Sequence, residues 1–299
     1  MDMLGITDLY KSFGDKKVLC GLNLAVAEHS VFGFVGKNGA GKTTTMKVVL
    51  GLLRADSGEI VVNGERVAYG QTATNRYIGY LPDVPEFYSF MTAPEYLRFC
   101  GEITGMSKEQ TRLRTDELLT LVGLAGEKHR IKGFSRGMKQ RLGIAQALLS
   151  RPKLLICDEP TSALDPVGRK EILDVLLSLR EHTTVLLSTH ILSDVERICT
   201  DVAFLNNGKV EIQGKLSEIK KHFRKDGYEL ETDSESEALN LLVRFPKMKK
   251  TGRCRIVFSE NDYSPSDIMR HLADRSVSIL KLERIEPTLE DLFMEVADK

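Results

Sequence analysis

The sequence predicts an α/β fold with a mainly parallel sheet and a phosphate-binding loop, followed by a small α+β domain. Residues 154–157 and 184–187 are short, mainly apolar runs that are followed by polar residues, as in buried parallel strands. The segment 166–180 between them has a helical pattern, so the three segments form a strand–helix–strand unit. A further apolar run, residues 31–35, precedes a glycine-rich loop. The chain of 299 residues is long enough for a large core and a smaller one, because single cores stop growing at roughly 250 to 300 residues.

The elements around the glycine-rich loop follow in chain order. Before the first apolar run, extended patterns alternate with turns at Gly14-Asp15 and at Gly21. After the loop we expect a buried helix over residues 44–53 and a hairpin over residues 58–68 that turns at Asn63-Gly64. The order strand, loop, helix is the one that a phosphate-binding loop requires.

The next part of the chain is predicted to be helical. Thr92 and Glu95 form a capping-box pattern, and helical patterns with breaks continue to about Leu149. We therefore expect a helical insertion at about residues 89–150 within a first domain that covers residues 1–215.

A second domain is expected over residues 216–299. The α/β pattern ends at a hairpin that turns at Asn207-Gly208, and the polar stretch 220–227 is typical of a linker with a short helix. Strand and helix patterns then alternate, which predicts a small α+β module. The expected strands are residues 228–230, 255–258 and 277–280, and the expected helices lie near Glu237 and Asp267.

Charge and cysteine content argue against several classes of protein. Lys plus Arg and Asp plus Glu both count 42, so no overall field attracts the chain to nucleic acid or anionic lipid. The five cysteines lack paired CxxC spacing, which argues against a zinc site or a disulfide framework.

No apolar run approaches the ~20 residues that a membrane-spanning helix needs, and the start lacks a signal segment, so we expect a cytosolic protein.

The glycine-rich loop carries the clearest motif. Residues 36–43 fit the pattern G-x-x-x-x-G-K-[ST], in which backbone N–H groups and the positive helix end surround the β- and γ-phosphates of a nucleotide. Lys42 adds charge to those phosphates, and the Thr43 hydroxyl is placed to ligate magnesium. The predicted binding residues are Gly36, Lys37, Asn38, Gly39, Ala40, Gly41, Lys42, Thr43 and Thr44.

Two acidic residues follow the apolar run 154–157. Asp158 and Glu159 should lie at the carboxyl end of a central strand, where α/β sheets bind ligands. Adjacent side chains on a strand diverge, so Asp158 would hold hydrated magnesium while Glu159 orients or deprotonates the attacking water. Alone, the pair would indicate only an exposed strand end; the phosphate loop favours the catalytic interpretation.

The segment Phe134-Ser135-Arg136-Gly137-Met138-Lys139-Gln140-Arg141 resembles the signature of ATP-binding-cassette (ABC) ATPases. In that family a serine and a glycine at a helix N-terminus bind the γ-phosphate held by the opposite subunit. Ser135 and Gly137 match the motif, whereas Arg136 replaces its first glycine and Met138 its glutamine. Alone, the segment would indicate an ordinary helix capped by Ser135.

Four further positions are compared with that family. Residues 162–165 resemble the loop that joins the two nucleotide sites across a dimer, and His190 resembles the histidine that contacts the γ-phosphate. Phe13 resembles the aromatic residue that stacks on adenine. Where the family has a glutamine that senses magnesium and water, this chain has Asp83, which either offers an oxygen to magnesium or is a solvated loop acid.

The resemblance covers residues 2–215 and implies a P-loop NTPase cassette, with an antiparallel β subdomain beside the central sheet. It implies an ATPase that uses ATP and Mg²⁺, with Glu159, His190 and Lys42 as catalytic residues.

The implied partners are a second ATP-binding subunit, identical or closely paralogous, and membrane-spanning subunits on separate chains. These would hold the protein at the cytoplasmic face of the cell membrane, and no nucleic acid partner is expected. The ending 287–293 looks like that of the multidrug, antibiotic or sodium exporter branch, so we expect export.

Two other classes of function compete with a transporter ATPase. Mechanical ATPases of DNA repair or ribosomes bring heptad arms, zinc-spaced cysteines, tandem cassettes or basic surfaces, and the sequence has none of these. A small-molecule kinase built on a phosphate loop has no use for residues 135–137 or 162–165. Co-purifying membrane subunits, nucleic acid or a phosphorylated metabolite would distinguish the three classes.

Overall fold

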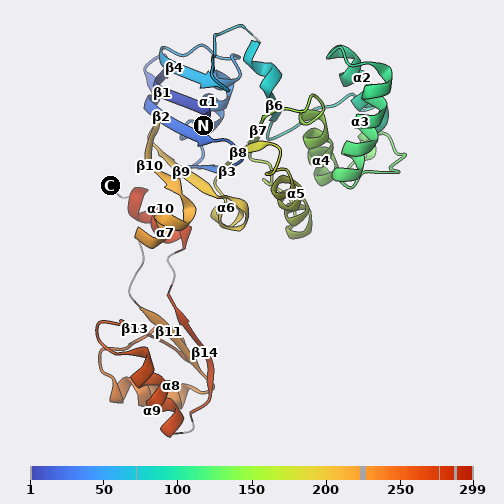
Figure 1. Cartoon of the computed structure of the whole chain (residues 1–299). Helices are drawn as coiled ribbons and strands as arrows, with labels where there is room; N and C mark the ends of the chain where they lie inside the picture. The colour runs from blue at the N-terminus through green and yellow to red at the C-terminus, as the bar shows by residue number, and fades with distance from the viewer. Residues whose placement is uncertain (1, 72, 223–226, 276, 286–287, 298–299) are drawn as a thin grey trace. The chain divides into compact units, whose positions relative to one another are not determined.

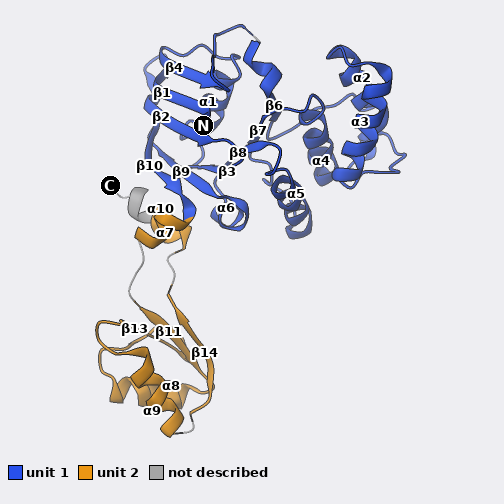
Figure 2. Cartoon of the chain, viewed as in Figure 1, with its two compact units in different colours: residues 1–216, 296–299 blue, residues 217–295 orange. Residues whose placement is uncertain are grey.

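The computed structural model describes residues 2–71, 73–222, 227–275, 277–285 and 288–297, with no side chain described beyond residue 293. The chain divides into two compact units, Met1–Leu216 with Val296–Lys299, and Ser217–Glu295 (Figure 2). The sequence predicts a division after residue 215, and the main segment of the first unit ends at Leu216. In the described part of the chain, every helix is too short or too polar to cross a membrane.

A six-stranded sheet forms the centre of the first unit (Figure 1). All neighbouring pairs are parallel except the hairpin of β9 and β10, as expected for strands joined by crossover connections. In β3, β7 and β8 every residue is buried, which explains the mainly apolar runs. In spatial order the strands are β10 (Lys209–Lys215), β9 (Asp201–Asn206), β3 (Val31–Val35), β8 (Thr184–Thr189), β7 (Leu154–Asp158) and β6 (Ile78–Leu81).

A second sheet of the first unit is antiparallel and shares one hydrophobic cluster with the central sheet. Gly21 lies inside a strand of this sheet, so its interpretation as a turn is wrong. Its φ is 85°, and an added Cβ would lie 2.8 Å from the hydroxyl of Tyr10, so the glycine serves close packing within the strand. In spatial order the strands are β2 (Lys16–Ala27), β1 (Asp2–Phe13), β4 (Ser57–Val62) and β5 (Glu65–Arg66).

The helix after the glycine-rich loop is α1 (Lys42–Val49). It ends at Val49, whereas the predicted helix extends to residue 53. Gly51 has a left-handed backbone, with φ of 69°. Its N–H donates to the Val48 carbonyl, and the Leu52 N–H donates to the Lys47 carbonyl. These two bonds form a glycine-terminated helix cap, which ends the helix.

The helical insertion contains α2 (Ala93–Ile103), α3 (Lys108–Leu121) and α4 (Arg136–Ala147). Capping boxes begin α2 at Thr92 and α3 at Ser107, so the pattern predicted for α2 is present. Two short 3₁₀ turns, Ala73–Tyr77 and Ile131–Gly133, and two more helices complete the first unit. The remaining helices are α5 (Pro166–Ser178) and α6 (Leu192–Ile198).

Between α7 and α10, the strands and helices of the second unit have the order βαββαβ, which is the split βαβ arrangement. Its antiparallel sheet has the order β12-β13-β11-β14, and α8 and α9 contribute Leu241, Ile268 and Leu272 to one hydrophobic cluster. The strand expected at 277–280 begins at Ile279 instead. Val277 lies outside it, because its N–H donates to the Leu272 carbonyl of α9. The elements are α7 (Leu216–His222), β11 (Tyr228–Thr232), α8 (Glu235–Arg244), β12 (Lys249–Lys250), β13 (Arg255–Phe258), α9 (Pro265–Asp274), β14 (Ile279–Arg284) and α10 (Leu289–Ala297).

Two sequence predictions lie partly outside the described residues. They concern Pro287, the start of the exporter-like ending, and residues 223–226 of the expected linker. In α10, Thr288 and Asp291 form a helix cap, because the Thr288 hydroxyl donates to the Asp291 carboxylate and accepts from the Asp291 N–H.

Candidate nucleotide-binding site

The glycine-rich loop joins the end of β3 to the start of α1. At Gly36 a Cβ would lie 2.8 Å from the Leu205 carbonyl oxygen, and Gly41 has φ of 113°. Both positions therefore exclude larger residues for local steric reasons. The Lys42 ammonium is buried and donates to the Gly36 carbonyl at 2.7 Å, so the side chain folds back over the loop. The loop thus gathers backbone amides, a helix N-terminus and one positive charge.

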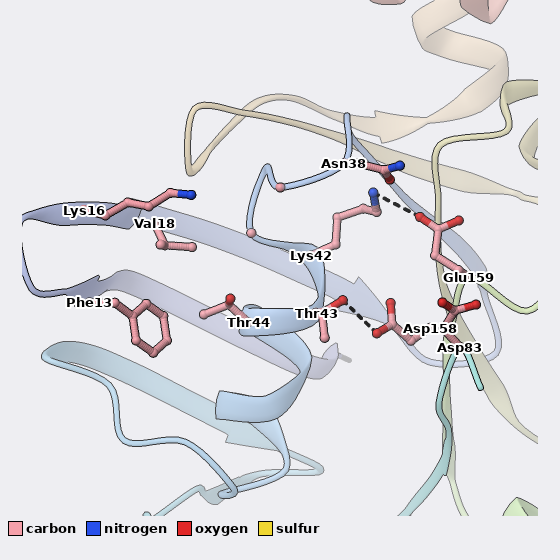
Figure 3. A pocket seen from close by; sticks show the side chains of 12 residues that line it. Phe13, Lys16, Val18, Asn38, Lys42, Thr43, Thr44, Asp83, Asp158 and Glu159 are labelled. Atoms are coloured by element: carbon pink, nitrogen blue, oxygen red, sulfur yellow. Dashed lines mark hydrogen bonds and ion pairs between the residues drawn. The ribbon is translucent and has the colours of Figure 1, made fainter. Parts of the chain in front are cut away.

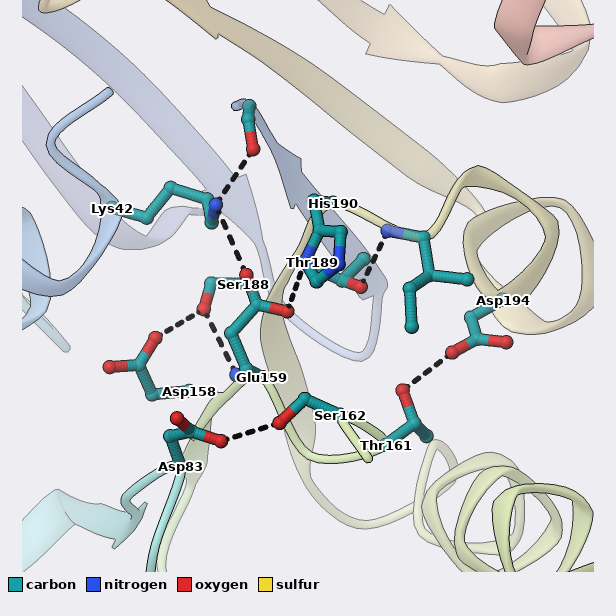
Figure 4. Close-up of polar contacts among 12 residues, drawn as sticks. Lys42, Asp83, Asp158, Glu159, Thr161, Ser162, Ser188, Thr189, His190 and Asp194 are labelled. Carbon is teal, nitrogen blue, oxygen red and sulfur yellow. Dashed lines mark hydrogen bonds and ion pairs between the residues drawn. The ribbon is translucent and has the colours of Figure 1, made fainter. Parts of the chain in front are cut away.

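The Lys42 ammonium also forms an ion pair with Glu159, at 3.1 Å from its Oε1 (Figures 3 and 4). The other carboxylate oxygen of Glu159 lies 2.9 Å from His190 Nδ1. The glutamate N–H donates to the Ser188 carbonyl at 3.0 Å, which ties the residue to the end of β8. The structure therefore joins three residues that the sequence predicted to be catalytic, although they come from three separate segments.

The side chains of Asp158 and Glu159 diverge, as those of two adjacent residues at a strand end should. The Asp158 carboxylate accepts hydrogen bonds from the Thr43 hydroxyl at 2.8 Å and from the Ser188 hydroxyl at 2.6 Å. Asp158 is 3% exposed, so these two hydroxyl groups are important for holding a buried charge. Burial raises the pKa of the neighbouring Tyr80 to about 12, and the charges of Asp158 and Asp83 add to this shift.

A cavity of about 610 Å³ opens beside these residues and is large enough for a nucleotide. Figure 3 shows Phe13 at one end of its lining and Asp83 at the other. Phe13 is 50% exposed, which leaves its ring available to a planar ligand. The lining residues are Phe13, Lys16, Val18, Asn38, Gly39, Gly41, Lys42, Thr43, Thr44, Asp83, Asp158 and Glu159.

Sequence reasoning missed several residues of this site. Lys16 and Val18 line the cavity from β2, and Ser188 holds Asp158 from β8. Asp194 on α6 is 3% exposed, and it accepts hydrogen bonds from the Thr161 hydroxyl at 2.6 Å and from Arg169 at 2.8 Å. It thereby fixes the loop that follows Glu159 (Figure 4). The polar residue that follows an apolar run, such as Ser188 after residues 184–187, was the one sequence signal available.

Asp83 is the second residue after β6 and lines the cavity. It accepts a hydrogen bond from the Ser162 hydroxyl at 2.6 Å, and its Oδ1 is 3.6 Å from an Nη atom of Arg136. Both interpretations of Asp83 given by the sequence omitted these contacts, because its partners are far away in the chain.

The signature segment lies at the N-terminus of α4. The Ser135 hydroxyl accepts a hydrogen bond from the Met138 N–H at 3.2 Å, so the serine caps the helix as expected. Among the described residues that line the 610 Å³ cavity, Ser135, Arg136, Gly137 and Met138 do not occur. One chain therefore brings the phosphate loop, the two acidic residues and Asp83 into the lining of this cavity. His190 contacts Glu159, and the signature lies next to the lining through the contact of Arg136 with Asp83.

Comparison with known proteins supports the family resemblance and the predicted fold class. A family model described as ABC transporter matches residues 19–162. A second one, described as ATP-binding protein DrrA1-3-like, C-terminal domain, matches residues 214–297. The fold is also similar to a solved ATP-binding subunit of an ABC transporter, with a TM-score of 0.65 and 34% identity over 74% of this chain and 93% of the other. The predicted fold class is therefore confirmed.

Two curated relatives match almost the whole chain. An ABC transporter ATP-binding protein of Bacillus subtilis (strain 168), YxlF, is 38% identical over 98% of this chain and 99% of its own length. The bacitracin transport ATP-binding protein BcrA of Bacillus licheniformis is 36% identical over 97% of this chain and 95% of its own length. These matches confirm the resemblance noted from the sequence. The chain belongs to the ABC transporter family, as an ATP-binding subunit that hydrolyses ATP to power transport.

Proposed function

We propose that two ATP-binding subunits, two copies of this chain or this chain and a close paralogue, close around two molecules of Mg-ATP. The phosphate loop of each would face Ser135, Arg136, Gly137 and Met138 of the other. The observation that carries this proposal is the capped N-terminus of α4, because its residues 135–138 are not among the described residues that line the nucleotide cavity of their own chain. A helix N-terminus favours anions, so a γ-phosphate supplied by a second subunit suits it.

In the proposed site, Phe13 stacks on adenine and the amides of residues 36–44 surround the phosphates. Lys42 now pairs with Glu159 at 3.1 Å. The phosphates of bound ATP would replace Glu159 as the partner of Lys42. The Glu159 carboxylate would then be free to accept a proton from the attacking water, while His190 holds its other oxygen and reaches the γ-phosphate.

The chemistry of the donors fits magnesium. The Thr43 hydroxyl and the Asp158 carboxylate lie 2.8 Å apart, and Asp83 lines the same cavity. Mg²⁺ prefers oxygen ligands and is usually held by one or two carboxylates together with the phosphates of its substrate. In keeping with this, the described residues contain no cluster of three or more acidic, histidine or cysteine side chains that could hold a metal alone. Magnesium would neutralise the charge that develops on the phosphates.

We further propose that the chain docks on membrane-spanning subunits at the cytoplasmic face of the cell membrane. Exposed aromatic and apolar side chains follow Asp83 directly: Val84 is 63%, Tyr88 51% and Phe90 61% exposed. The rings of Tyr88 and Phe90 lie 5.9 Å apart, so they form one patch. An exposed apolar patch beside a ligand site is typical of a protein interface. The names of relatives that refer to bacitracin transport and linearmycin resistance favour export as the direction.

The composite site is tested by an acidic substitution. Ser135→Glu should abolish dimer closure and ATP hydrolysis, because the new carboxylate repels the γ-phosphate of the other subunit, whereas ATP binding to the dilute chain should remain. Ser107→Glu is a matched control, since Ser107 caps α3 with the same 3.2 Å hydrogen bond and lies on the same helical insertion. Ser107→Glu should retain ATPase activity. Full activity of Ser135→Glu would refute the composite site.

Mixing two inactive variants sharpens this test. A Lys42→Ala chain has a damaged phosphate loop and an intact signature, whereas a Ser135→Glu chain has the reverse. A heterodimer therefore rebuilds one complete site. ATPase activity measured on mixing should exceed the sum of the separate variants if one complete site hydrolyses ATP. Mixing Lys42→Ala with Glu159→Gln, which damages the same half of the site in both chains, should give no recovery.

A further inference from the structure

Two positions where the chain departs from the family motif meet in space. Asp83 stands where the family has glutamine, and Arg136 stands where it has the first glycine of the signature. An Nη atom of Arg136 lies 3.6 Å from Asp83 Oδ1. The Ser162 hydroxyl lies between them, donating to Asp83 at 2.6 Å and lying 3.4 Å from Arg136. Figure 4 shows the Asp83 carboxylate and the Ser162 hydroxyl facing each other. The three residues come from the loop after β6, the start of α4 and the loop after β7.

Arg136 is electrostatically unusual, because it is the first residue of α4. A positive side chain at a helix N-terminus is unfavourable, since the helix dipole places positive charge there. The first turn of α4 contains no acidic residue that could offset it. Asp83 supplies that negative charge from another element. Both side chains are 47% exposed, so the pair is weak enough to be exchanged for other partners.

Each member of the pair has a second partner of opposite charge that Mg-ATP would supply. Asp83 lines the 610 Å³ nucleotide cavity together with Asp158 and Thr43, so it would face the cation of the chain's own Mg-ATP. Arg136 adjoins Ser135 at the helix end that, in the proposed dimer, receives the γ-phosphate of the other subunit. The same substrate therefore competes for both ends of the pair.

We propose that Asp83 and Arg136, bridged by Ser162, form an intrachain latch that ATP opens. This proposal rests on the composite site proposed above and names its regulation. In the nucleotide-free chain the latch holds the start of α4 to the loops of its own site and neutralises Arg136. In the closed dimer Arg136 exchanges the Asp83 carboxylate for the γ-phosphate of the other subunit. Asp83 is a positioning residue in this scheme, because it acts through Arg136, and its effect is to raise the amount of ATP needed for closure.

The test is a double-mutant cycle on dimerisation, measured by sedimentation with Mg-ATP in a Glu159→Gln chain, which slows hydrolysis. Asp83→Asn keeps the shape of the side chain and removes its charge. A surface ion pair is worth about 0.2–1 kcal/mol, so this change should lower the dimer dissociation constant about 1.4- to fivefold for each latch that opens. The effect should vanish when Arg136→Gln is also present, and should persist with Arg136→Lys, which keeps the charge. Ser162→Ala should tighten the dimer in the same direction by a smaller factor.

Asp174→Asn is the matched control. Asp174 pairs with Arg197 at 2.9 Å, and these side chains are 51% and 42% exposed, so the pair resembles the latch in exposure but lies outside the site. Asp174→Asn should leave the dimer dissociation constant unchanged.

The cycle separates the latch from the function on which it rests. If Asp83→Asn changes dimerisation by the same factor whether Arg136 is intact or carries the Arg136→Gln substitution, Asp83 does not act through Arg136 and the latch is refuted. If the Glu159→Gln chain binds ATP but does not dimerise at all, the composite site fails instead. Weaker dimerisation of Asp83→Asn in the chain that keeps Arg136 would also overturn the proposal.

Discussion

Glu159 combines an uncommon backbone conformation with two close side-chain partners, the Lys42 ammonium and the His190 ring. Its φ of 47° is in the left-handed region, as is that of Ala163 in the same loop, with φ of 52°. A residue other than glycine in this region costs of order 1–3 kcal/mol, so the surrounding structure must hold it there. The N–H bond to Ser188 and the contacts with Lys42 and His190 supply that constraint. The strain is located at the residue that we propose as the catalytic base.

Glu159→Gln should bind ATP and fail to hydrolyse it. The amide keeps the shape of the side chain but cannot accept the proton of the attacking water. We expect the rate of phosphate release to fall by about 10²–10⁴-fold, the range for loss of a general base, while an ATP-bound dimer accumulates in sedimentation. Near-normal phosphate release would exclude Glu159 as the base.

Phe13→Ala should weaken ATP binding. Stacking of a base on an aromatic ring is worth roughly 1 to 3 kcal/mol, which corresponds to about 5- to 150-fold in affinity. Equilibrium binding of a fluorescent ATP analogue would measure the change. Tyr10→Ala is a suitable control, because Tyr10 is 46% exposed in the same strand but packs over Gly21 and is not part of the cavity lining. An unchanged affinity of Phe13→Ala would remove the role from Phe13.

At the scale of elements, the position of α4 depends on two glycines. At Gly143 in α4 a Cβ would lie 2.5 Å from Leu81, and at Gly79 in β6 it would lie 2.2 Å from the Ala147 carbonyl oxygen. The helix therefore approaches the sheet edge more closely than larger residues would allow. Because α4 carries the signature at its start and β6 leads to Asp83, this close packing sets the distance between Arg136 and Asp83.

Gly79→Ala should destabilise the first unit by about 1–3 kcal/mol, the usual cost of overpacking, because the neighbouring atom is rigid backbone. Urea unfolding would measure the loss. Gly5→Ala is the control, since Gly5 is also in a strand but has no atom within 4 Å of the added Cβ. Equal stabilities of the two variants would contradict the proposed close packing.

At the scale of the whole molecule, we propose that the two units divide the work. Every predicted residue of the nucleotide site lies at or before His190, within the first unit. The second unit matches a DrrA1-3-like C-terminal domain, and we propose that it has a regulatory or dimerising role.

A chain ending at residue 216 should still bind ATP, with an affinity within a few-fold of that of the full chain. Isothermal titration of both chains would test this, with circular dichroism to establish that the shorter chain is folded. Lys42→Ala in the shorter chain is the negative control. Loss of ATP binding by a folded shorter chain would show that the second unit contributes to the nucleotide site.

The sequence by itself determined the elements and the motif that surrounds the phosphates. The mainly apolar runs of β7 and β8, the loop at 36–43 and the cap of α4 at Ser135 depend on neighbours in the chain, so local patterns predict them. The order of motifs along the chain also identified the family.

Only the tertiary structure decided which distant side chains meet. Asp83 and Ser162 are 79 positions apart, and Thr161 and Asp194 are 33 apart, yet each pair is joined by a 2.6 Å hydrogen bond. Likewise, no local pattern indicates that Arg136 faces Asp83 of its own chain. The physical reason is that such contacts depend on the spatial order of strands and on how closely α4 packs against β6, which are set by the packed core as a whole.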